Sequence, residues 1–130
     1  MTMVERSTRC IVGWRVGEER SAAVMQDLVD TAPQALFYFS DAFSTYEALI
    51  YKPGIHLSLP NKSQTYSVEG DNAELRHYLA RLARRSRCFS RCLQALRRAV
   101  KLFVHAWNRR QLHRLQFPNY PAHLFQFINP

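Results

Sequence analysis

The sequence predicts an α/β fold, and three observations predict it. Apolar residues alternate over residues 9–16, recur with helical spacing over residues 18–32, and form an unbroken run over residues 35–39. Alternation is typical of a strand with one buried face, and a short continuous apolar run is typical of a strand covered on both sides. A strand, a helix and a buried strand in succession form a crossover unit. We therefore expect the two strands to pair in parallel through a right-handed connection.

The predicted helix at 18–32 begins with acidic residues, which the helix dipole favours there, and Pro33 ends it. Asp41 follows the apolar run at 35–39 directly. Open α/β sheets place functional groups at the carboxyl ends of parallel strands, so Asp41 is the best-placed carboxylate in the first half of the chain. A turn or a helix cap explains an aspartate at this position equally well.

Residues 44–59 contain two short elements. Ser44 and Glu47 match a capping box, which predicts a helix from there to about Ile50. This pattern gives Glu47 a structural explanation and removes it from the catalytic candidates. Apolar and polar residues then alternate over residues 55–59, and this alternation predicts a half-buried strand.

A further helix is expected from about residue 68. Its inward face carries four apolar side chains: Leu75, Tyr78, Leu79 and Leu82. Glu69, Asn72 and Arg76 recur at helical spacing on a second face. Asp71 and Glu74 match a capping box, which explains both of them as groups that close the start of a helix. Glu69 has no such explanation, so it is the candidate carboxylate of this stretch.

The last long helix is expected to follow a cap at Ser90. One apolar stripe predicts its core face: Leu93, Leu96, Val100, Phe103, Val104 and Trp107. Arg97, Arg98 and Lys101 face away from that stripe, either as a solvated surface or as a cationic binding surface. The segment from Phe117 is interrupted by prolines and rich in aromatic residues, so we expect it to pack across the body of the protein.

Charge is distributed very unevenly along the 130 residues, whose net charge is +8. Residues 1–74 carry six basic and ten acidic side chains, whereas residues 75–130 carry twelve basic and no acidic ones. Nucleic acid is the commonest anionic partner of such a one-signed segment. A basic surface that serves solubility, or a ribosome-like role, is the alternative. No signal-peptide core or membrane-spanning apolar run is present, so the sequence predicts a soluble cytoplasmic protein.

Two blocks of sequence resemble a known family. The blocks are Ser40–Tyr46 (SDAFSTY) and Val68–Arg76 (VEGDNAELR), the second of which continues into residues 79–82 and 89–91. They resemble the catalytic domain of the insertion-sequence-one family of bacterial DDE transposases, and the likeness runs from about residue 10 to residue 122. It implies a ribonuclease H-like fold: a mixed sheet of few strands flanked by helices, with a long basic helical region at the C-terminal end. The implied activity is DNA strand cleavage and strand transfer at the ends of a mobile element.

The resemblance also implies roles for individual residues. Asp41 matches the second catalytic aspartate and Glu69 the catalytic glutamate, which together would bind Mg²⁺ or Mn²⁺ as part of a two-ion site. Asn72 and Arg76 match the motif that follows this glutamate. The remaining basic residues would hold the DNA backbone: Arg81, Arg84, Arg85, Arg87, Arg91, Arg97, Arg98 and Lys101. Implied partners are double-stranded DNA, both terminal repeats and target, and further copies of the transposase in a synaptic complex at the bacterial nucleoid.

The sequence departs from the family pattern in two respects. Ala42 stands where the family usually has glycine. The first catalytic aspartate of the family lies on a strand upstream of the predicted strand at 9–16, and this chain starts too late to contain it. We therefore expect residues 1–130 to form a single N-terminally truncated catalytic domain, inactive alone, with a DNA-contacting helical part at about 67–114. It would be either a decayed copy or one frame of a two-frame element whose upstream product supplies the rest.

Two other hypotheses remain open at this stage. The chain could be a non-catalytic basic DNA-binding remnant that competes with intact transposase. It could also be a relic that barely folds, because strands are missing from its sheet.

Overall fold

The computed structural model describes residues 1–17, 19–41, 43–60, 65–79 and 92–129, and every structural statement below concerns these residues. The chain forms an α/β structure whose elements run, in order, β1 (Thr2–Val4), β2 (Ile11–Trp14), α1 (Ala22–Thr31), β3 (Phe37–Ser40), α2 (Ser44–Glu47), β4 (Ile55–Ser58), α3 (Tyr66–Tyr78), α4 (Leu93–Gln116) and the 3₁₀ helix η3 (Leu124–Phe127). The α/β class predicted from the sequence is confirmed. None of the helices in these ranges is long and apolar enough to cross a membrane.

The described strands form two separate two-stranded sheets. β1 and β2 make an antiparallel hairpin with an irregularity in register between Met3 and Val4, and β3 pairs with β4 in parallel. The predicted parallel pairing of the strand at 9–16 with the strand at 35–39 is therefore wrong. The partner of β2 is β1. Because β1 has only three residues, its sequence shows no recognisable alternation, and the strand could not be predicted. The crossover rule therefore linked two strands that do not pair.

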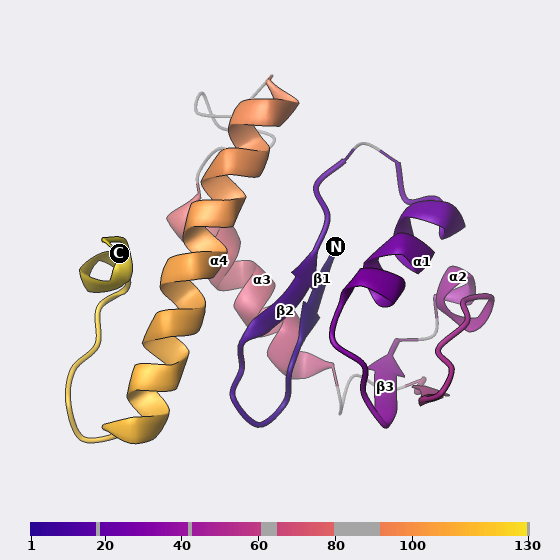
Figure 1. Cartoon of the computed structure of the whole chain (residues 1–130), viewed down its shortest axis with the longest axis horizontal. Helices are drawn as coiled ribbons and strands as arrows, with labels where there is room; N and C mark the ends of the chain where they lie inside the picture. The colour runs from indigo at the N-terminus through magenta and orange to yellow at the C-terminus, as the bar shows by residue number, and fades with distance from the viewer. Residues whose placement is uncertain (18, 42, 61–64, 80–91, 130) are drawn as a thin grey trace.

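The β1–β2 hairpin lies between helices. α1 covers one face, and α3 and α4 lie on the other side, with α4 and η3 at the far edge of the molecule (Figure 1). On the α1 side, a Cβ on Gly13 would come 2.8 Å from Leu28 Cδ1, so the close approach of α1 leaves no room for a side chain at this position unless Leu28 shifts. On the α4 side, Ile11 belongs to the core cluster that contains Val100 and Trp107.

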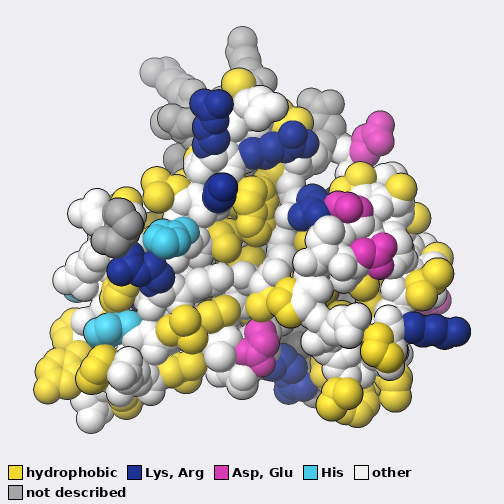
Figure 2. All heavy atoms as spheres, in the orientation of Figure 1, with side chains coloured by type: hydrophobic (Ala, Val, Ile, Leu, Met, Phe, Trp, Pro, Cys, Tyr) yellow, Lys and Arg dark blue, Asp and Glu magenta, His cyan; other side chains and the backbone are white. Residues whose placement is uncertain are grey.

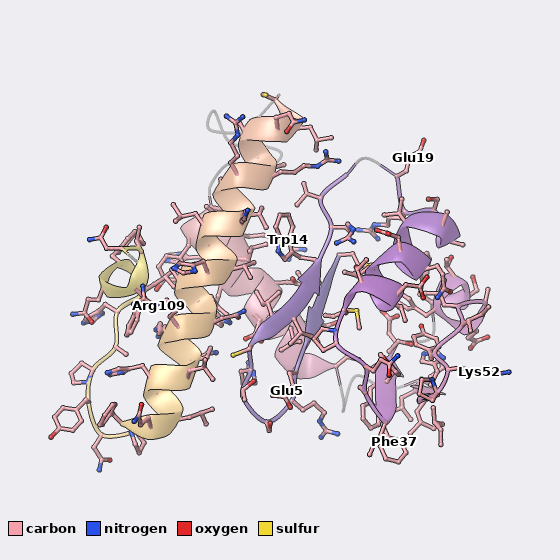
Figure 3. All side chains as sticks on the ribbon, in the orientation of Figure 1. Glu5, Trp14, Glu19, Phe37, Lys52 and Arg109 are labelled. Carbon is pink, nitrogen blue, oxygen red and sulfur yellow. The ribbon has the colours of Figure 1, made fainter. Side chains whose placement is uncertain are left out.

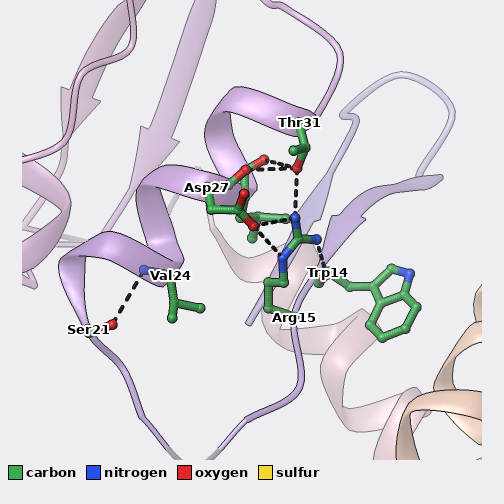
Figure 4. A network of polar contacts seen from close by, with 7 residues as sticks. Trp14, Arg15, Ser21, Val24, Asp27 and Thr31 are labelled. Carbon is green, nitrogen blue, oxygen red and sulfur yellow. Dashed lines mark hydrogen bonds and ion pairs between the residues drawn. The ribbon is translucent and has the colours of Figure 1, made fainter.

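α1 is tied to the hairpin by a network of polar contacts (Figure 4). The guanidinium of Arg15 donates to Asp27 Oδ2 from Nε at 3.0 Å and from Nη2 at 2.6 Å, and to Thr31 Oγ1 at 2.8 Å. The hydroxyl of Ser21 accepts from the amide of Val24 and so caps the helix at its N-terminus. This cap explains why α1 begins at Ala22, later than predicted, and has no acidic residue in its first turn.

Two further predictions about α1 and its surroundings are settled by the structure. α1 ends at Thr31, ahead of Pro33, as predicted. Glu19 precedes the helix and lies in the loop before it (Figure 3). The prediction that this helix begins with acidic residues is therefore wrong for the described residues, because the helix starts only at Ala22.

Among the described residues, the β3–β4 sheet is covered on one face only, which corrects two predictions. Phe37 of β3 is 54% exposed and Ile55 of β4 is 56% exposed. The opposite face lies against Tyr51, whose ring is 5.0 Å from that of Tyr38 and 4.3 Å from that of His56. The run at 35–39 is thus not covered on both sides, and the apolar residues of β4 are the exposed ones. An apolar run shows that burial is favourable and does not show whether a covering element is present.

The short helix α2 spans Ser44–Glu47, so it begins one residue earlier than a cap at Ser44 predicts and ends earlier than expected. Its N-cap residue is Phe43, and no side chain caps it. The predicted capping box between Ser44 and Glu47 is therefore wrong, because Ser44 already lies inside the helix. The capping box was the reason for removing Glu47 from the catalytic candidates, so this reason no longer holds.

The long helix α4 supplies most of the core. Leu96, Val100, Phe103, Val104 and Trp107 are buried, which confirms the apolar stripe. Leu93, at the first turn, is exposed and falls outside the stripe. Ser90, the predicted cap, lies outside the described residues, and no side chain caps α4 at its N-cap residue Cys92.

The C-terminal segment packs back onto α4, as predicted. Leu124 of η3 is buried in the α4 core cluster. Arg109 of α4, which is labelled in Figure 3, donates to the carbonyl oxygens of Phe127 and Asn129. This arginine therefore anchors the C-terminal segment to the helix.

Candidate functional site

Asp41 lies directly after β3, at the carboxyl end of the parallel pair, and its side chain is exposed. Its Oδ1 atom accepts a hydrogen bond from the amide of Phe43 at 3.3 Å. Its carbonyl oxygen accepts from Ser40 Oγ at 2.9 Å and from Ser58 Oγ at 3.3 Å. The carboxylate thus steadies the turn into α2 while remaining open to solvent. The bond to Phe43 confirms the interpretation of Asp41 as a turn residue, and its role as a site carboxylate stays a prediction.

Glu69 lies in the first turn of α3 and is exposed. The helix begins at Tyr66, two residues earlier than predicted, so Glu69 is already inside the helix and its amide donates to Thr65 O at 3.2 Å. A carboxylate in the first turn interacts favourably with the helix dipole. The expectation that Glu69 lies near the start of this helix is confirmed, although it lies inside the first turn.

Asp71 has a different role from the predicted one. Its residue is 3% exposed, and its Oδ1 atom lies 2.6 Å from Nη2 of Arg9 in an ion pair. The predicted capping box formed by Asp71 and Glu74 is wrong, because both residues lie within α3, whose N-cap residue is Thr65. Of the three acidic residues Glu69, Asp71 and Glu74, Asp71 is therefore the one that is buried and links α3 to the hairpin.

Asn72 is also engaged with the hairpin. Its Oδ1 atom accepts a hydrogen bond from Thr2 Oγ1 at 2.8 Å. Together with the Arg9–Asp71 pair, this bond fastens α3 to β1 and to the turn between β1 and β2. The helix that carries Glu69 is thereby held against the same hairpin that α1 and α4 enclose.

The basic residues predicted to contact DNA fall into two groups. Arg97, Arg98 and Lys101 are exposed on α4, as predicted, and Arg76 is exposed in the last turn of α3. Lys and Arg side chains gather over the N-terminal half of α4, whereas acidic side chains lie mainly over the α1 side (Figure 2). The others lie outside the described residues: Arg81, Arg84, Arg85, Arg87 and Arg91.

Arg76 also acts on the start of the chain. Burial lowers the pKa of the Met1 amino group, and the positive charges of Arg20 and Arg76 lower it further. The charge of Arg76 therefore interacts with that of the amino terminus, in keeping with the contact between α3 and β1.

The carboxylates fit part of a metal site. Asp41 and Glu69 offer exposed oxygen donors of the kind that Mg²⁺ and Mn²⁺ prefer. Within the described ranges, however, no group of three or more His, Cys, Asp or Glu side chains lies close enough together to hold a metal ion. The described residues by themselves thus do not assemble the oxygen ligands that a two-ion site needs.

Sequence reasoning missed the polar residues around Asp41. Ser40 pairs with Ser58 in the parallel register, and His56 pairs with Tyr38 two residues earlier. His56 Nε2 lies 2.7 Å from Ser40 Oγ. Burial lowers the pKa of His56, against an opposing effect of the Glu47 charge. Alternation over residues 55–59 placed His56 and Ser58 on one face, and only the pairing of β3 with β4 could have shown that this face meets Ser40.

The fold and these residues define an α/β protein with exposed carboxylates at a strand end and at a helix start, and with exposed cations on the long helix α4. Carboxylates for metal ions and cations for phosphates are what proteins that process phosphodiesters use. The chain belongs to the IS1 transposase family, whose model matches residues 2–109. This match confirms the resemblance seen in the sequence. No curated protein and no solved structure matches the chain, so the ribonuclease H-like fold stays a prediction.

Proposed function

We propose that this chain is the catalytic part of a transposase that cleaves DNA strands at the ends of an insertion sequence and transfers them to target DNA. The family match over residues 2–109 carries the proposal. Asp41 and Glu69 would be two of the ligands for Mg²⁺ or Mn²⁺. In such sites a pair of ions activates the attacking hydroxyl and stabilises the leaving oxygen. This chain's own contribution would be to hold the two carboxylates directly after β3 and in the first turn of α3.

We further propose that the chain is inactive alone. Two carboxylates cannot supply enough oxygen ligands for two ions, and a third acid would come from a segment outside these 130 residues, such as the product of an upstream reading frame. The split sheet supports this idea. Arg6 in the hairpin turn lies 5.0 Å from the ring of Phe39 in β3, yet among the described strands β1 pairs only with β2 and β3 only with β4. Each therefore offers an open edge to an additional strand.

The exposed face of the β3–β4 sheet supports assembly with further copies or partner chains. Phe37, Ile55 and Leu57 are exposed together on that face. Exposed apolar patches of this kind commonly mark interaction surfaces. A synaptic complex on paired element ends, in the cytoplasm and at the nucleoid, is the setting that we propose for the single domain of residues 1–130.

Iron-mediated hydroxyl-radical cleavage of the protein tests the metal ligands directly. Fe²⁺ bound in place of Mg²⁺ cleaves the backbone near its ligands in the presence of a reductant. We expect fragments that end near Asp41 and Glu69, competed away by Mg²⁺ and absent in Asp41→Ala. Cleavage that Asp41→Ala and Glu69→Ala leave unchanged would refute their role as ligands.

Double-stranded DNA is the proposed partner of the cationic surface of α4. Three exposed cations on one helix, Arg97, Arg98 and Lys101, would contact phosphates and release counterions, so affinity falls steeply with salt. Replacing all three with alanine should weaken binding to any duplex and reduce the salt slope by about 2 to 3. Lys52→Ala is the matched control, because Lys52 is exposed but lies on the α2 side, far from α4 (Figure 3). Equal effects of the triple variant and of Lys52→Ala would contradict this surface.

The alternative is a non-catalytic DNA-binding protein that competes with intact transposase. The absence of a three-ligand group among the described residues is the observation that favours it. It predicts that Asp41→Ala and Glu69→Ala leave both DNA affinity and inhibition of an intact transposase unchanged. Inhibition that requires the two carboxylates would exclude this alternative.

A further inference from the structure

The carbonyl oxygen of Asp41 is held by side chains from both strands of the parallel pair. Ser40 lies opposite Ser58 at the strand ends, and both hydroxyl groups lie within hydrogen-bond distance of this oxygen. His56, two residues before Ser58 on the same face of β4, brings its Nε2 atom to 2.7 Å from Ser40 Oγ. One serine thus contacts both the Asp41 peptide and a histidine.

The Ser40 hydroxyl has a single proton, which we assign to its bond with the carbonyl oxygen of Asp41, and the direction of the contact with His56 then depends on the tautomer of His56. Ser40 Oγ donates that proton to the carbonyl oxygen of Asp41 at 2.9 Å, so it has none left to give to His56. The 2.7 Å contact is then a hydrogen bond only if Nε2 of His56 carries a proton and donates it to Ser40 Oγ. The result is a directed chain from His56 through Ser40 to Asp41.

The imidazole ring is itself held in place. It stacks on Tyr51, with ring centroids 4.3 Å apart and planes inclined by 18°. The hydroxyl of Tyr51 donates to the carbonyl oxygen of Tyr46 at 2.9 Å. Burial lowers the pKa of His56, which favours the neutral ring near pH 7, with one protonated nitrogen. The ring therefore has a fixed plane and one edge directed at Ser40.

We propose that His56 is a positioning residue which, through Ser40, fixes the Asp41 peptide so that the Asp41 carboxylate is presented at the strand end for metal binding. The inference rests on the proposed function, because it takes Asp41 to be a ligand. Partners of this kind orient a ligand without touching the metal, and their loss typically lowers metal affinity 10- to 100-fold. Asp41 is fixed twice: its carbonyl oxygen by the serines and Oδ1 by the amide of Phe43.

Three variants of the full 130-residue chain test the hydrogen-bond chain. His56→Phe keeps an aromatic ring on Tyr51 but removes the donor. His56→Gln places an amide N–H near the position of Nε2. Ser40→Ala removes the connecting hydroxyl without touching the ring. The readout is the Mn²⁺ dissociation constant, measured by electron paramagnetic resonance, with Asp41→Ala as reference and His105→Phe, an exposed histidine on α4, as matched control.

We expect His56→Phe and Ser40→Ala each to weaken Mn²⁺ binding about 10-fold, and the double variant to be no weaker than either single one, because all three break the same chain. His56→Gln should stay within about 3-fold of the parent, and His105→Phe should not change it. Nitrogen-15 NMR of the parent should show His56 protonated at Nε2. Each variant is measured well below its own unfolding midpoint, so that loss of folding does not enter.

Two results would overturn the inference and separate it from the proposed function. If Asp41→Ala weakens Mn²⁺ binding but His56→Phe and Ser40→Ala do not, Asp41 is a ligand and His56 does not position it. An Nδ1-protonated His56 has the same consequence. If Asp41→Ala itself leaves Mn²⁺ binding unchanged, the proposed metal role of Asp41 fails, and the positioning role fails with it.

Discussion

Arg9→Ala would leave a buried carboxylate without its ionic partner. Asp71 lies inside α3 with its side chain 4% exposed, and Arg9 Nη2 approaches it to 2.6 Å. A second contact joins Arg9 Nε to Asp71 Oδ2 at 3.4 Å. Because this pair links the hairpin to the helix that carries Glu69, its loss affects both the stability of the fold and the attachment of a candidate ligand.

The expected cost follows from the burial of the two partners. Breaking a fully buried ion pair costs about 3–5 kcal/mol. The side chain of Arg9 is 40% exposed, so water can solvate the carboxylate partly after truncation, and we expect about 2 kcal/mol for Arg9→Ala. Arg9 also has a φ of 61°, a left-handed conformation that glycine adopts without strain. Arg9→Gly should therefore be about 1 kcal/mol more stable than Arg9→Ala.

Urea denaturation at pH 7 measures these differences, and Asp71→Asn supplies the control for charge. The double variant Arg9→Ala/Asp71→Asn should be more stable than Arg9→Ala alone, because it removes the unpaired buried charge. A free energy of unfolding for Arg9→Ala within about 0.5 kcal/mol of the parent value would contradict this role of Arg9, because such a change is typical of an uninvolved surface residue. The expected benefit of glycine is refuted if Arg9→Gly is the less stable of the two Arg9 variants.

Two other predictions concern the hairpin. Hydrogen bonds from Ser7 and then Thr8 lower the pKa of Glu5 from its ordinary 4.5 to about 2. A depressed folded-state pKa gives stability that is present above pH 4.5 and is lost as the pH falls towards 2, amounting to about 1 kcal/mol at this exposed site. An NMR titration of the Glu5 carboxyl checks this, and a midpoint near 4.5 would contradict it. Gly13→Ala should lower the free energy of unfolding by about 1–2 kcal/mol, because the new Cβ would meet Leu28 Cδ1 at 2.8 Å. Leu28→Ala should lower it by about 3 kcal/mol, because it removes a buried side chain. The double variant should lose about 1 kcal/mol less than their sum, because the new methyl group enters the space that Leu28 leaves, and strict additivity in chemical denaturation would refute this packing.

Long helices with a periodic apolar pattern could be predicted from the sequence, whereas the pairing of the short strands could not. The stripe that contains Val100, Phe103 and Trp107 predicted the core face of α4 because a helix of 24 residues repeats its period many times. β1 has only three residues, and nothing in them shows that they pair with β2. The direction and partner of each short strand depend on contacts distant in the sequence, which a local pattern does not contain.

The candidate site shows the same division. Asp41 and Glu69 were identified from local position and motif, and the structure places them at a strand end and in the first turn of a helix, as expected. Asp71 matched a capping pattern, but its ion pair with Arg9, 62 residues away, explains its burial instead. The bond between His56 and Ser40 depends on the register of β3 against β4, which only the folded structure specifies.

Strand cleavage of terminal-repeat DNA in the presence of Mg²⁺ or Mn²⁺ tests the central proposal most directly. The chain alone should bind this DNA and leave it uncut. Supplying the upstream segment translated from the neighbouring frame should restore cleavage, and Asp41→Ala should abolish it again. Cleavage by the chain alone that depends on Asp41 would contradict the proposed incompleteness, and no cleavage with the upstream segment present would contradict the proposed catalytic role.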